Sequence, residues 1–221
     1  MSLLPFKIVS VDGGAASGKS STSNGVASEL NLMHVDTGSH YRAVTLACLQ
    51  AGIGPEEDLT GFLSGLELGT VIEGNSACIC LNGEKIDPAS LRSEAVNKNV
   101  SPFAAVPEVR EKVKFYQRAQ AEIAQKESFT GLIMEGRDIG SVIFPNADLK
   151  IYLIADEATR SARRKDEGQS DTIAERDKID SSRKTAPLKQ PEGSIAINTG
   201  NFTLKEVIAQ VVDLYKGNLS N

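Results

Sequence analysis

A phosphate-binding loop near the start of the sequence constrains this chain more than any other feature. Residues 13–20 read G-G-A-A-S-G-K-S, which satisfies the pattern G-x-x-x-x-G-K-[ST] in full. The apolar run Lys7–Val11 before it is a predicted strand, and a helix is predicted over Lys19–Leu30 after it. Because motif and context agree, we expect an α/β fold in which the loop joins a buried strand to a helix.

The residue types in this loop predict binding of a nucleoside triphosphate with Mg²⁺. Glycine lets backbone N–H groups converge on phosphate oxygens, and the following helix directs its positive end at the same anion. Lys19 supplies a mobile cation for the β- and γ-phosphates, and Ser20 offers a hydroxyl to Mg²⁺. The predicted ATP-binding residues of the loop are Gly13, Gly14, Ala15, Ala16, Ser17, Gly18, Lys19, Ser20 and Ser21.

Alternating strands and helices predict a parallel sheet covered on both faces. Further strands are expected at Leu32–Val35, Gly131–Glu135, Leu149–Ile154 and Ile195–Asn198. Helices are expected at Ser39–Ala51, from Pro55 onward, at Pro107–Lys126, at Asp156–Lys165, and after a capping box of Thr203 and Glu206, with an apolar stripe of Val207, Val211 and Leu214.

A small antiparallel β unit interrupts this alternation. Its three short strands are expected at Thr70–Glu73, Ala77–Leu81 and Glu84–Ile86, and Asn82-Gly83 between the last two is a strong hairpin signal. A helix is expected over Ala89–Asn99. We therefore predict an insert at residues 69–99 within a core domain formed by residues 1–68 and 100–221.

A polar segment at about residues 166–184 is nearly free of large apolar side chains. Such a segment contributes little to a core, so we predict a short mobile lid within the core domain. Lids that close on both substrates exclude water, which competes with the acceptor for a phosphoryl group. No guanine-reading N-K-x-D segment of a switch GTPase occurs. The length of 221 residues and this segment therefore favour a small-molecule kinase.

Composition limits the partners that this chain can have. Lys and Arg number 24 against 29 acids, and the net charge of −5 disfavours a nucleic-acid coat or a basic membrane binder. No apolar run approaches the roughly 20 residues of a membrane helix, and we expect no signal peptide. Three cysteines are too few for a disulfide scaffold, so we expect a cytoplasmic protein. From the charge and the lack of a long apolar run we expect neither a nucleic-acid nor a membrane partner.

Arginines follow the second and third predicted core strands and populate the polar segment. Arg42 and Arg137 are expected to face the phosphate loop, because ligands bind beyond the carboxyl ends of the strands in an open α/β sheet. Guanidinium binds phosphate in a bidentate manner, which suits an acceptor that is itself a phosphate. The arginines of the last group are Arg160, Arg163, Arg164, Arg176 and Arg183.

Four blocks in this order resemble bacterial cytidylate kinases, which phosphorylate CMP and dCMP. They are the phosphate loop, V-D-T-G-S-H-Y-R, E-G-R-D-I-G-S-V-I-F-P-N-A and E-R-D-K-I-D-S-S-R-K-T-A-P-L, and the β insert is also similar. The resemblance covers about residues 7–216. It implies a P-loop kinase fold with a five-stranded parallel core sheet in the order 2-3-1-4-5. It also implies ATP with Mg²⁺, CMP or dCMP as acceptor, and a monomer.

The resemblance also implies roles for individual residues. Lys19, Arg137 and Arg183 are implied at the transfer site, and Arg163 among the lid arginines at ATP. The implied CMP-binding residues are Thr37, Arg110 and Asp138 at the base, Ser101, Arg176 and Asp180 at the ribose, and Arg42, Arg137 and Arg183 at the phosphate. Asp138 can accept from the exocyclic amine of cytosine, and Arg110 can donate to its acceptors. For Mg²⁺, Ser20 is implied together with Glu135 or Asp36 acting through water.

This chain departs from the usual family pattern at three places. Glu135 stands where Asp is frequent, Thr37 stands where Ser is frequent, and the segment between Arg164 and Arg176 is shorter than in many members. The roles of Asp12 (structural or near the transferring phosphate) and of Asp36 (orienting a Mg²⁺ water or Arg42) stay open.

Two competing functions remain open on the sequence. One is a small P-loop kinase with UMP, AMP or a non-nucleotide acceptor. The other is a nucleotide-dependent binding protein that kept the loop and lost transfer, although its arginines argue against this because ATP sensing needs no acceptor clamp.

Overall fold

The computed structural model describes residues 5–166, 182 and 187–217. The strands are β1 (Lys7–Gly13), β2 (Leu32–Asp36), β3 (Leu68–Glu73), β4 (Ser76–Leu81), β5 (Glu84–Lys85), β6 (Gly131–Gly136), β7 (Leu149–Ile154) and β8 (Ile195–Asn198). The helices are α1 (Lys19–Leu30), α2 (Thr37–Gln50), α3 (Thr60–Gly65), α4 (Pro88–Leu91), α5 (Glu94–Phe103), α6 (Pro107–Lys126), the π-helix η1 (Ile139–Ile143), α7 (Glu157–Asp166) and α9 (Leu204–Gly217).

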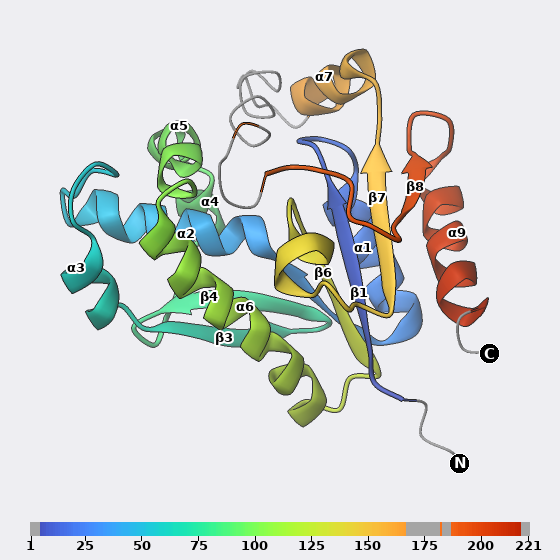
Figure 1. The fold of residues 1–221 in the computed structure, drawn as a ribbon, viewed down its shortest axis with the longest axis horizontal. Helices are drawn as coiled ribbons and strands as arrows, with labels where there is room; N and C mark the ends of the chain where they lie inside the picture. Colours follow the sequence, from blue (N-terminus) through green and yellow to red (C-terminus); the bar gives the residue numbers. More distant parts are fainter. Residues whose placement is uncertain (1–4, 167–181, 183–186, 218–221) are drawn as a thin grey trace.

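One mixed sheet runs through the described part of the chain, with its strands in the order β3-β4-β2-β6-β1-β7-β8 (Figure 1). The five strands from β2 to β8 are parallel, and numbered among themselves along the chain they stand in the order 2-3-1-4-5. The fold class and the strand order expected from the sequence are therefore confirmed.

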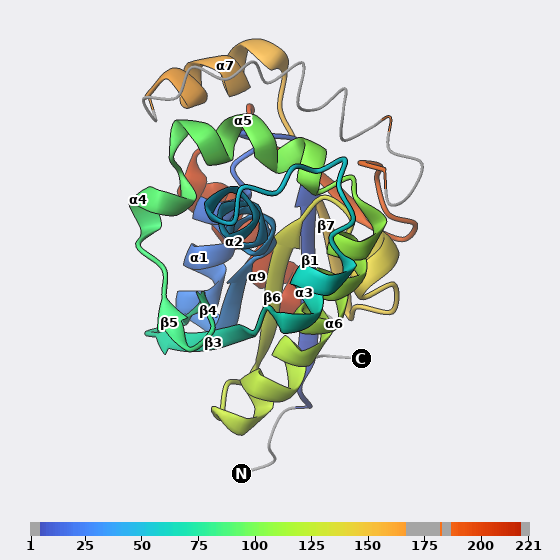
Figure 2. The same ribbon diagram turned by 90° about the vertical axis from the view of Figure 1, so that its left-hand side faces the viewer.

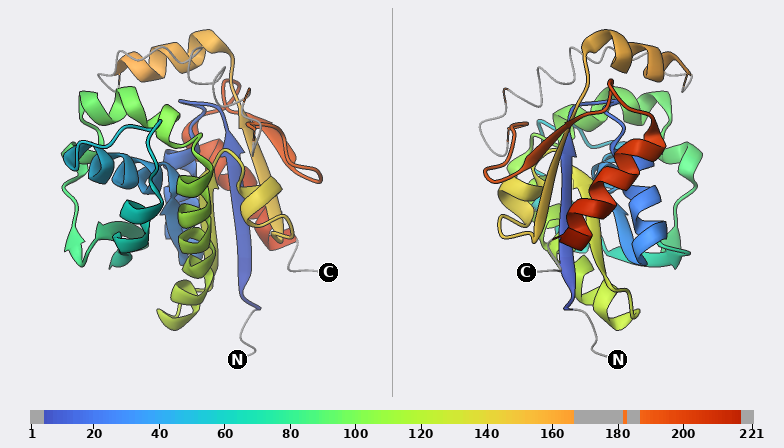
Figure 3. Two further views of the ribbon diagram at one scale, coloured as in Figure 1. Left: turned by 60° about the vertical axis from the view of Figure 1, so that its left-hand side comes forward. Right: turned by 90° about the vertical axis from the view of Figure 1, so that its right-hand side faces the viewer.

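Helices cover both faces of this sheet. On one face α1 and α9 pack through Val26, Ala27, Val207 and Val211 onto alternate residues of the parallel strands (Figure 3). On the other face α6 and η1 contact the intervening residues, including Met33, Leu132 and Met134. Successive residues of β6 thus face opposite layers, which explains why its burial is continuous rather than alternating.

A third group of helices stands beyond β2. Helices α2, α3, α5 and α6 share an apolar cluster that includes Val44, Cys48, Phe103 and Val113. Figure 2 shows α2 and α5 beside the carboxyl ends of the parallel strands, with α7 above them. This arrangement brings α2 and α5 to the same edge of the sheet as the phosphate loop.

The β insert continues the main sheet. Strands β3 and β4 pair antiparallel, and β4 joins β2 through a single parallel bridge between His34 and Ser76. Asn82 and Gly83 adopt φ values of 50° and 81°, as an Asn-Gly hairpin turn requires. The Asn75 side chain donates to the carbonyls of Ala27 and Leu32, which ties the hairpin to the core.

The helix expected from Pro55 is wrong. Residues around Pro55 form a turn in which Gly54 N donates to Glu57 Oε1 at 2.6 Å, and α3 begins only at Thr60. The Asp58 carboxylate accepts from Thr60 N at 2.9 Å, and this local bond competes with continuation of the turn at Pro55 into a helix.

The helix expected over Ala89–Asn99 is two helices. The Asp87 carboxylate accepts from Ala89 N and Ser90 N and starts α4, and the Ser93 hydroxyl accepts from Val96 N and starts α5. A second N-cap only six residues after the first restarts the helix in a new direction.

Other local expectations are confirmed. Thr203 and Glu206 form the capping box, since Thr203 N donates to Glu206 Oε2 at 2.8 Å and Glu206 N to Thr203 Oγ1 at 3.3 Å. Helix α9 buries Val207 and Val211, and also Tyr215, which the expected stripe omitted. Most of the predicted lid, residues 167–181 and 183–184, lies outside the described residues.

Candidate active site

The phosphate loop leaves β1 at its carboxyl end and enters α1. Gly13 is required there, because a Cβ would lie 2.4 Å from the Leu153 carbonyl oxygen. Ala16 and Gly18 adopt positive φ values of 55° and 91°, the backbone conformations from which anion-binding nests are built. The loop is thus shaped to turn N–H groups toward an anion.

Two cations contact the backbone of this loop. Lys19 Nζ donates to the carbonyls of Gly13 and Gly14 at 3.0 and 2.7 Å, and Arg137 Nη1 donates to Gly13 O at 2.7 Å. Removal from solvent and the neighbouring Arg137 lower the pKa of Lys19 to about 8. A bound polyphosphate would raise this pKa again, because an opposite charge favours the ammonium form.

A cavity of about 190 Å³ opens beside the loop at the carboxyl edge of the sheet. The loop side contributes Lys19 and Ser20, and Asp36 and Glu135 come from the ends of β2 and β6. Five of the residues predicted to bind CMP line the same cavity, namely Thr37, Arg42, Ser101, Arg137 and Asp138. Tyr41 and Arg92 also line it, and sequence reasoning missed both.

Arg42 is held on α2 by the insert and α5. Its Nη1 donates to Leu91 O at 3.0 Å and to Asn97 Oδ1 at 2.7 Å. Asn97 in turn donates through Nδ2 to Arg92 O at 2.7 Å. Asn97 thus orients one predicted phosphate ligand and fixes the backbone of Arg92 beside it.

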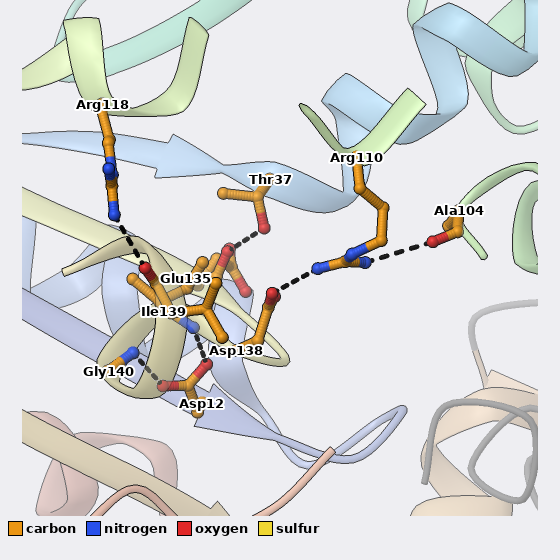
Figure 4. A network of polar contacts seen from close by, with 10 residues as sticks. Asp12, Thr37, Ala104, Arg110, Arg118, Glu135, Asp138, Ile139 and Gly140 are labelled. Atoms are coloured by element: carbon orange, nitrogen blue, oxygen red, sulfur yellow. Dashed lines mark hydrogen bonds and ion pairs between the residues drawn. The ribbon is translucent and has the colours of Figure 1, made fainter. Parts of the chain in front are cut away.

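Arg110 and Asp138 form a buried ion pair, although 28 residues separate them in the chain (Figure 4). Arg110 also donates to Ala104 O at 3.2 Å and stacks its guanidinium on the Tyr41 ring, 5.5 Å from the centroid. Exposure is only 7% for Arg110 and 4% for Asp138. Such a pair can present a donor and an acceptor side by side to a planar ligand.

Asp12 binds the backbone directly after Asp138. Its carboxylate accepts from Ile139 N and Gly140 N, both at 2.8 Å, and so holds the start of η1 directly after Asp138 (Figure 4). Burial outweighs these two bonds and raises the pKa of Asp12 to about 6. Of the two roles left open for Asp12, the structure displays the structural one.

Glu135 is the second carboxylate of the site and is 2% exposed. Its Oε2 accepts from Ser20 Oγ at 3.0 Å, and its Oε1 lies 2.9 Å from His34 Nε2. Its carbonyl accepts from Thr37 Oγ1 at 2.6 Å (Figure 4). The two oxygen groups predicted to serve Mg²⁺ are therefore in direct contact, and they are the hard ligands that Mg²⁺ prefers.

Asp36 is the N-cap residue of α2, a role that neither open alternative included. Its Oδ1 accepts from Gly38 N at 2.8 Å and caps α2. It lines the cavity as well, so a role near Mg²⁺ or Arg42 stays a prediction.

A second cavity of about 300 Å³ lies on the other side of the loop, lined by Gly18, Ser21 and Arg163. Arg163 donates to Thr199 Oγ1 and Thr199 O, both at 2.9 Å, and to Ala16 O at 3.4 Å. The exposed ring of Phe202 also lines this cavity, and sequence reasoning missed it together with Thr199. The remaining predicted site residues, Arg176, Asp180 and Arg183, lie outside the described residues.

Comparison with known proteins decides the family. The sequence matches the family model for cytidylate kinase over residues 9–217. The chain belongs to the cytidylate kinase family. Cytidylate kinases similar to it include those of Streptomyces avermitilis, at 38% identity over 96% of this chain and 93% of that protein, and of Clostridium botulinum strain Loch Maree, at 37% over 94% and 97%.

Two solved structures share the fold of this cytidylate kinase family member. A sugar kinase from Janibacter sp. HTCC2649 superposes with a TM-score of 0.53 at 14% identity, covering 96% of this chain and 95% of that one. TT1252 from Thermus thermophilus superposes with a TM-score of 0.53 at 15% identity, covering 98% and 100%. At these identities the likeness concerns the fold alone.

Proposed function

We propose that this chain transfers the γ-phosphoryl group of ATP to CMP or dCMP, giving a diphosphate and ADP. The observation that carries the proposal is the buried Arg110–Asp138 ion pair, whose Asp138 lines the same cavity as Lys19 of the phosphate loop. Membership of the cytidylate kinase family supports the same acceptor.

The acceptor base is read by its hydrogen-bonding edge in this proposal. Asp138 accepts from the exocyclic amine of cytosine, Arg110 donates to its acceptor atoms, and Thr37 contacts the base. Uracil carries a carbonyl in place of the amine, which would leave the buried Asp138 facing another acceptor. Ser101, Arg176 and Asp180 are assigned to the ribose, and residues 69–99 to the monophosphate-binding insert.

Phosphoryl transfer depends here on positioning and charge. Arg42 and Arg137 clamp the acceptor phosphate, and Lys19 exchanges its carbonyl partners for the migrating phosphoryl oxygens. Because a phosphate acceptor is already anionic, no general base is required. The segment at 166–184 is proposed to close over the site and bring Arg183 to the transferring group.

The residues present fit Mg²⁺ bound with ATP. Ser20 and Glu135, with Asp36 as an alternative, would hold it directly or through water. When bound, Mg²⁺ supplies neutralisation of the negative charge that develops on the phosphates. Residues Gly13 to Ser21 and Arg163 are assigned to ATP itself.

The setting of the protein is also part of this proposal. Among the described residues no helix is long and apolar enough to cross a membrane. We retain a cytoplasmic monomer without a nucleic-acid partner as the expectation. Sedimentation of the purified protein would measure the oligomeric state.

The decisive experiment is ADP release from ATP and Mg²⁺ with CMP, dCMP, UMP, AMP and GMP supplied separately. Fast turnover with CMP and dCMP alone is expected. Turnover with another acceptor instead would leave a small P-loop kinase of different specificity. ATP binding without any acceptor-dependent turnover would identify a nucleotide-binding protein that has lost transfer.

A further inference from the structure

The Glu135 carboxylate is held at both of its oxygens. Ser20 Oγ donates to Oε2 at 3.0 Å, and His34 Nε2 lies 2.9 Å from Oε1. An ionised carboxylate can only accept, so His34 Nε2 is the donor whenever Glu135 is charged. His34 and Glu135 are 8% and 2% exposed, which makes this contact largely shielded from competition by water.

His34 and Glu135 lie on the face of the sheet that α1, with Ser20, covers. Strands β2 and β6 are parallel with Asp36 opposite Glu135, so His34 is a diagonal neighbour of Glu135. Leu32 and Ile133 lie two residues before His34 and Glu135 and therefore on the same face, and both pack in the apolar cluster that includes residues of α1. Ser20 is the second residue of α1, so both side chains meet the phosphate loop on its own side of the sheet.

The length of the Glu135 side chain explains why such a partner is useful. Glutamate carries one more methylene and one more rotatable bond than the aspartate frequent at this position of the family, and it has more orientations to lose on ordering. An imidazole on the neighbouring strand removes that freedom. In metal sites, the groups that hold a ligating carboxylate tune its affinity for the metal.

We propose that His34 is a positioning residue that aims Glu135 at Ser20 and thereby tightens the binding of MgATP. The inference rests on the Mg²⁺ role assigned to Ser20 and Glu135 under the proposed function. His34 itself touches neither nucleotide nor reacting atoms in this scheme. It acts through the carboxylate that it orients.

The first test compares His34→Leu, which removes the donor, with His34→Gln, whose amide retains one. The readout is the ratio of the dissociation constants of a fluorescent ATP analogue in EDTA and in saturating Mg²⁺. We expect His34→Leu to lower this ratio about tenfold, the low end for such supporting groups, by weakening binding in Mg²⁺ alone. His34→Gln is expected to stay near wild type.

The matched control is Cys78→Ser. Cys78 lines a cavity of about 230 Å³ together with His34, but its Sγ contacts Glu73 and not Glu135. No change in the ratio is expected for it. Equal ratios for His34→Leu, Cys78→Ser and the wild type would overturn the inference. An equal loss of nucleotide affinity in EDTA and in Mg²⁺ would also overturn it, because such a loss indicates a packing role.

A double-mutant cycle with Glu135→Asp isolates the part of the effect that passes through Glu135. If His34 acts by steering the longer carboxylate, His34→Leu should have little further effect on the ratio once Glu135 is shortened. Full additivity would contradict the inference.

The wild type separates failure of the inference from failure of the Mg²⁺ proposal. A wild-type ratio of one would reject the Mg²⁺ role of Ser20 and Glu135 and the inference with it. A large wild-type ratio that His34→Leu leaves unchanged would reject the inference alone.

Discussion

At the scale of single residues, the proposed base selection depends on the buried pair of Arg110 and Asp138. Both side chains are oriented before any ligand arrives, since Arg110 also binds Ala104 O and stacks on Tyr41. Preorganised polar groups of this kind discriminate strongly, because a mismatched base leaves them unpaired in a buried site.

Asp138→Asn should therefore lose its preference for cytosine. A hydrogen bond to a charged group contributes about 1.5–3 kcal/mol, so we expect kcat/KM for CMP to fall on the order of 100-fold, with much less change for UMP. Steady-state kinetics with both nucleotides measure this. Asp213→Asn, an exposed change on α9, is the control, and equal losses for CMP and UMP would contradict base reading.

At the scale of elements, α5 supports the arginine that we propose as a clamp on the acceptor phosphate. It carries Asn97, which binds Arg42 from α2 and the backbone of Arg92 after α4. The break between α4 and α5 makes this possible, because it lets α5 turn its first residues toward Arg42.

Asn97→Ala should raise the KM for CMP about fivefold, as expected for loss of one hydrogen bond of about 1 kcal/mol that orients Arg42. The KM for ATP should not change. Asn99→Ala is a matched control on the same helix, since the one hydrogen bond of the Asn99 amide within the described residues goes to Ala95 O of α5 itself. A matching rise in KM for both variants would show a general loosening of α5 instead.

For the capping box of α9 we predict a change in stability without a change in kinetics. Thr203→Ala removes the hydroxyl that accepts from Glu206 N, which should cost about 1 kcal/mol of unfolding free energy. Chemical denaturation measures it, and kcat and KM should stay at wild-type values, because α9 packs on the sheet face formed with α1. A fall in kcat would reveal coupling from α9 to the site.

At the scale of the whole molecule, the two cavities lie on either side of the phosphate loop at the carboxyl edge of one sheet. Helix α7 lies above this edge (Figure 1). Donor and acceptor nucleotides would thus meet over β1, where Lys19 and Arg137 already converge on Gly13.

Stability of the whole molecule should respond to acid through His40. Burial lowers the pKa of His40 to about 4, below its usual 6.5, and its ring packs edge-on against Tyr116. Between these two pKa values the unfolded chain binds the extra proton, so this residue makes folding less favourable as the pH falls from 6.5 toward 4. The loss approaches about 3 kcal/mol.

His40→Gln removes this titration. The difference in unfolding free energy between variant and wild type should shift in favour of the variant by up to about 3 kcal/mol from pH 7 to pH 4. Denaturation at a series of pH values measures the shift. The raised pKa of Asp12 changes stability in the opposite direction, but this contribution is the same in both proteins and cancels in the difference. A constant difference across the range would contradict this, because it would show that the folded and unfolded chains bind the His40 proton equally.

Local features were within reach of the sequence alone. The phosphate loop, the strand and helix alternation, the Asn82-Gly83 turn and the Thr203–Glu206 box depend on contacts between residues close in the chain, and they were predicted correctly. The helix expected from Pro55 and the single helix over Ala89–Asn99 were wrong for a local reason too. The side chains of Asp58 and Ser93 accept from Thr60 N and Val96 N, backbone donors that an uninterrupted helix would pair with carbonyls.

Tertiary structure decided how distant residues combine into the site. His34 and Ser20 stand 101 and 115 residues from Glu135, and neither contact leaves a signal in hydrophobic periodicity. They meet because β2, β6 and α1 share one face of a sheet whose order differs from chain order. The sequence therefore determined which chemical groups this protein has and which fold carries them. Only the packing of that fold decided that His34, Asn97 and Asp12 contact the predicted site residues or the backbone beside them, because register and layering bring together what the chain keeps apart.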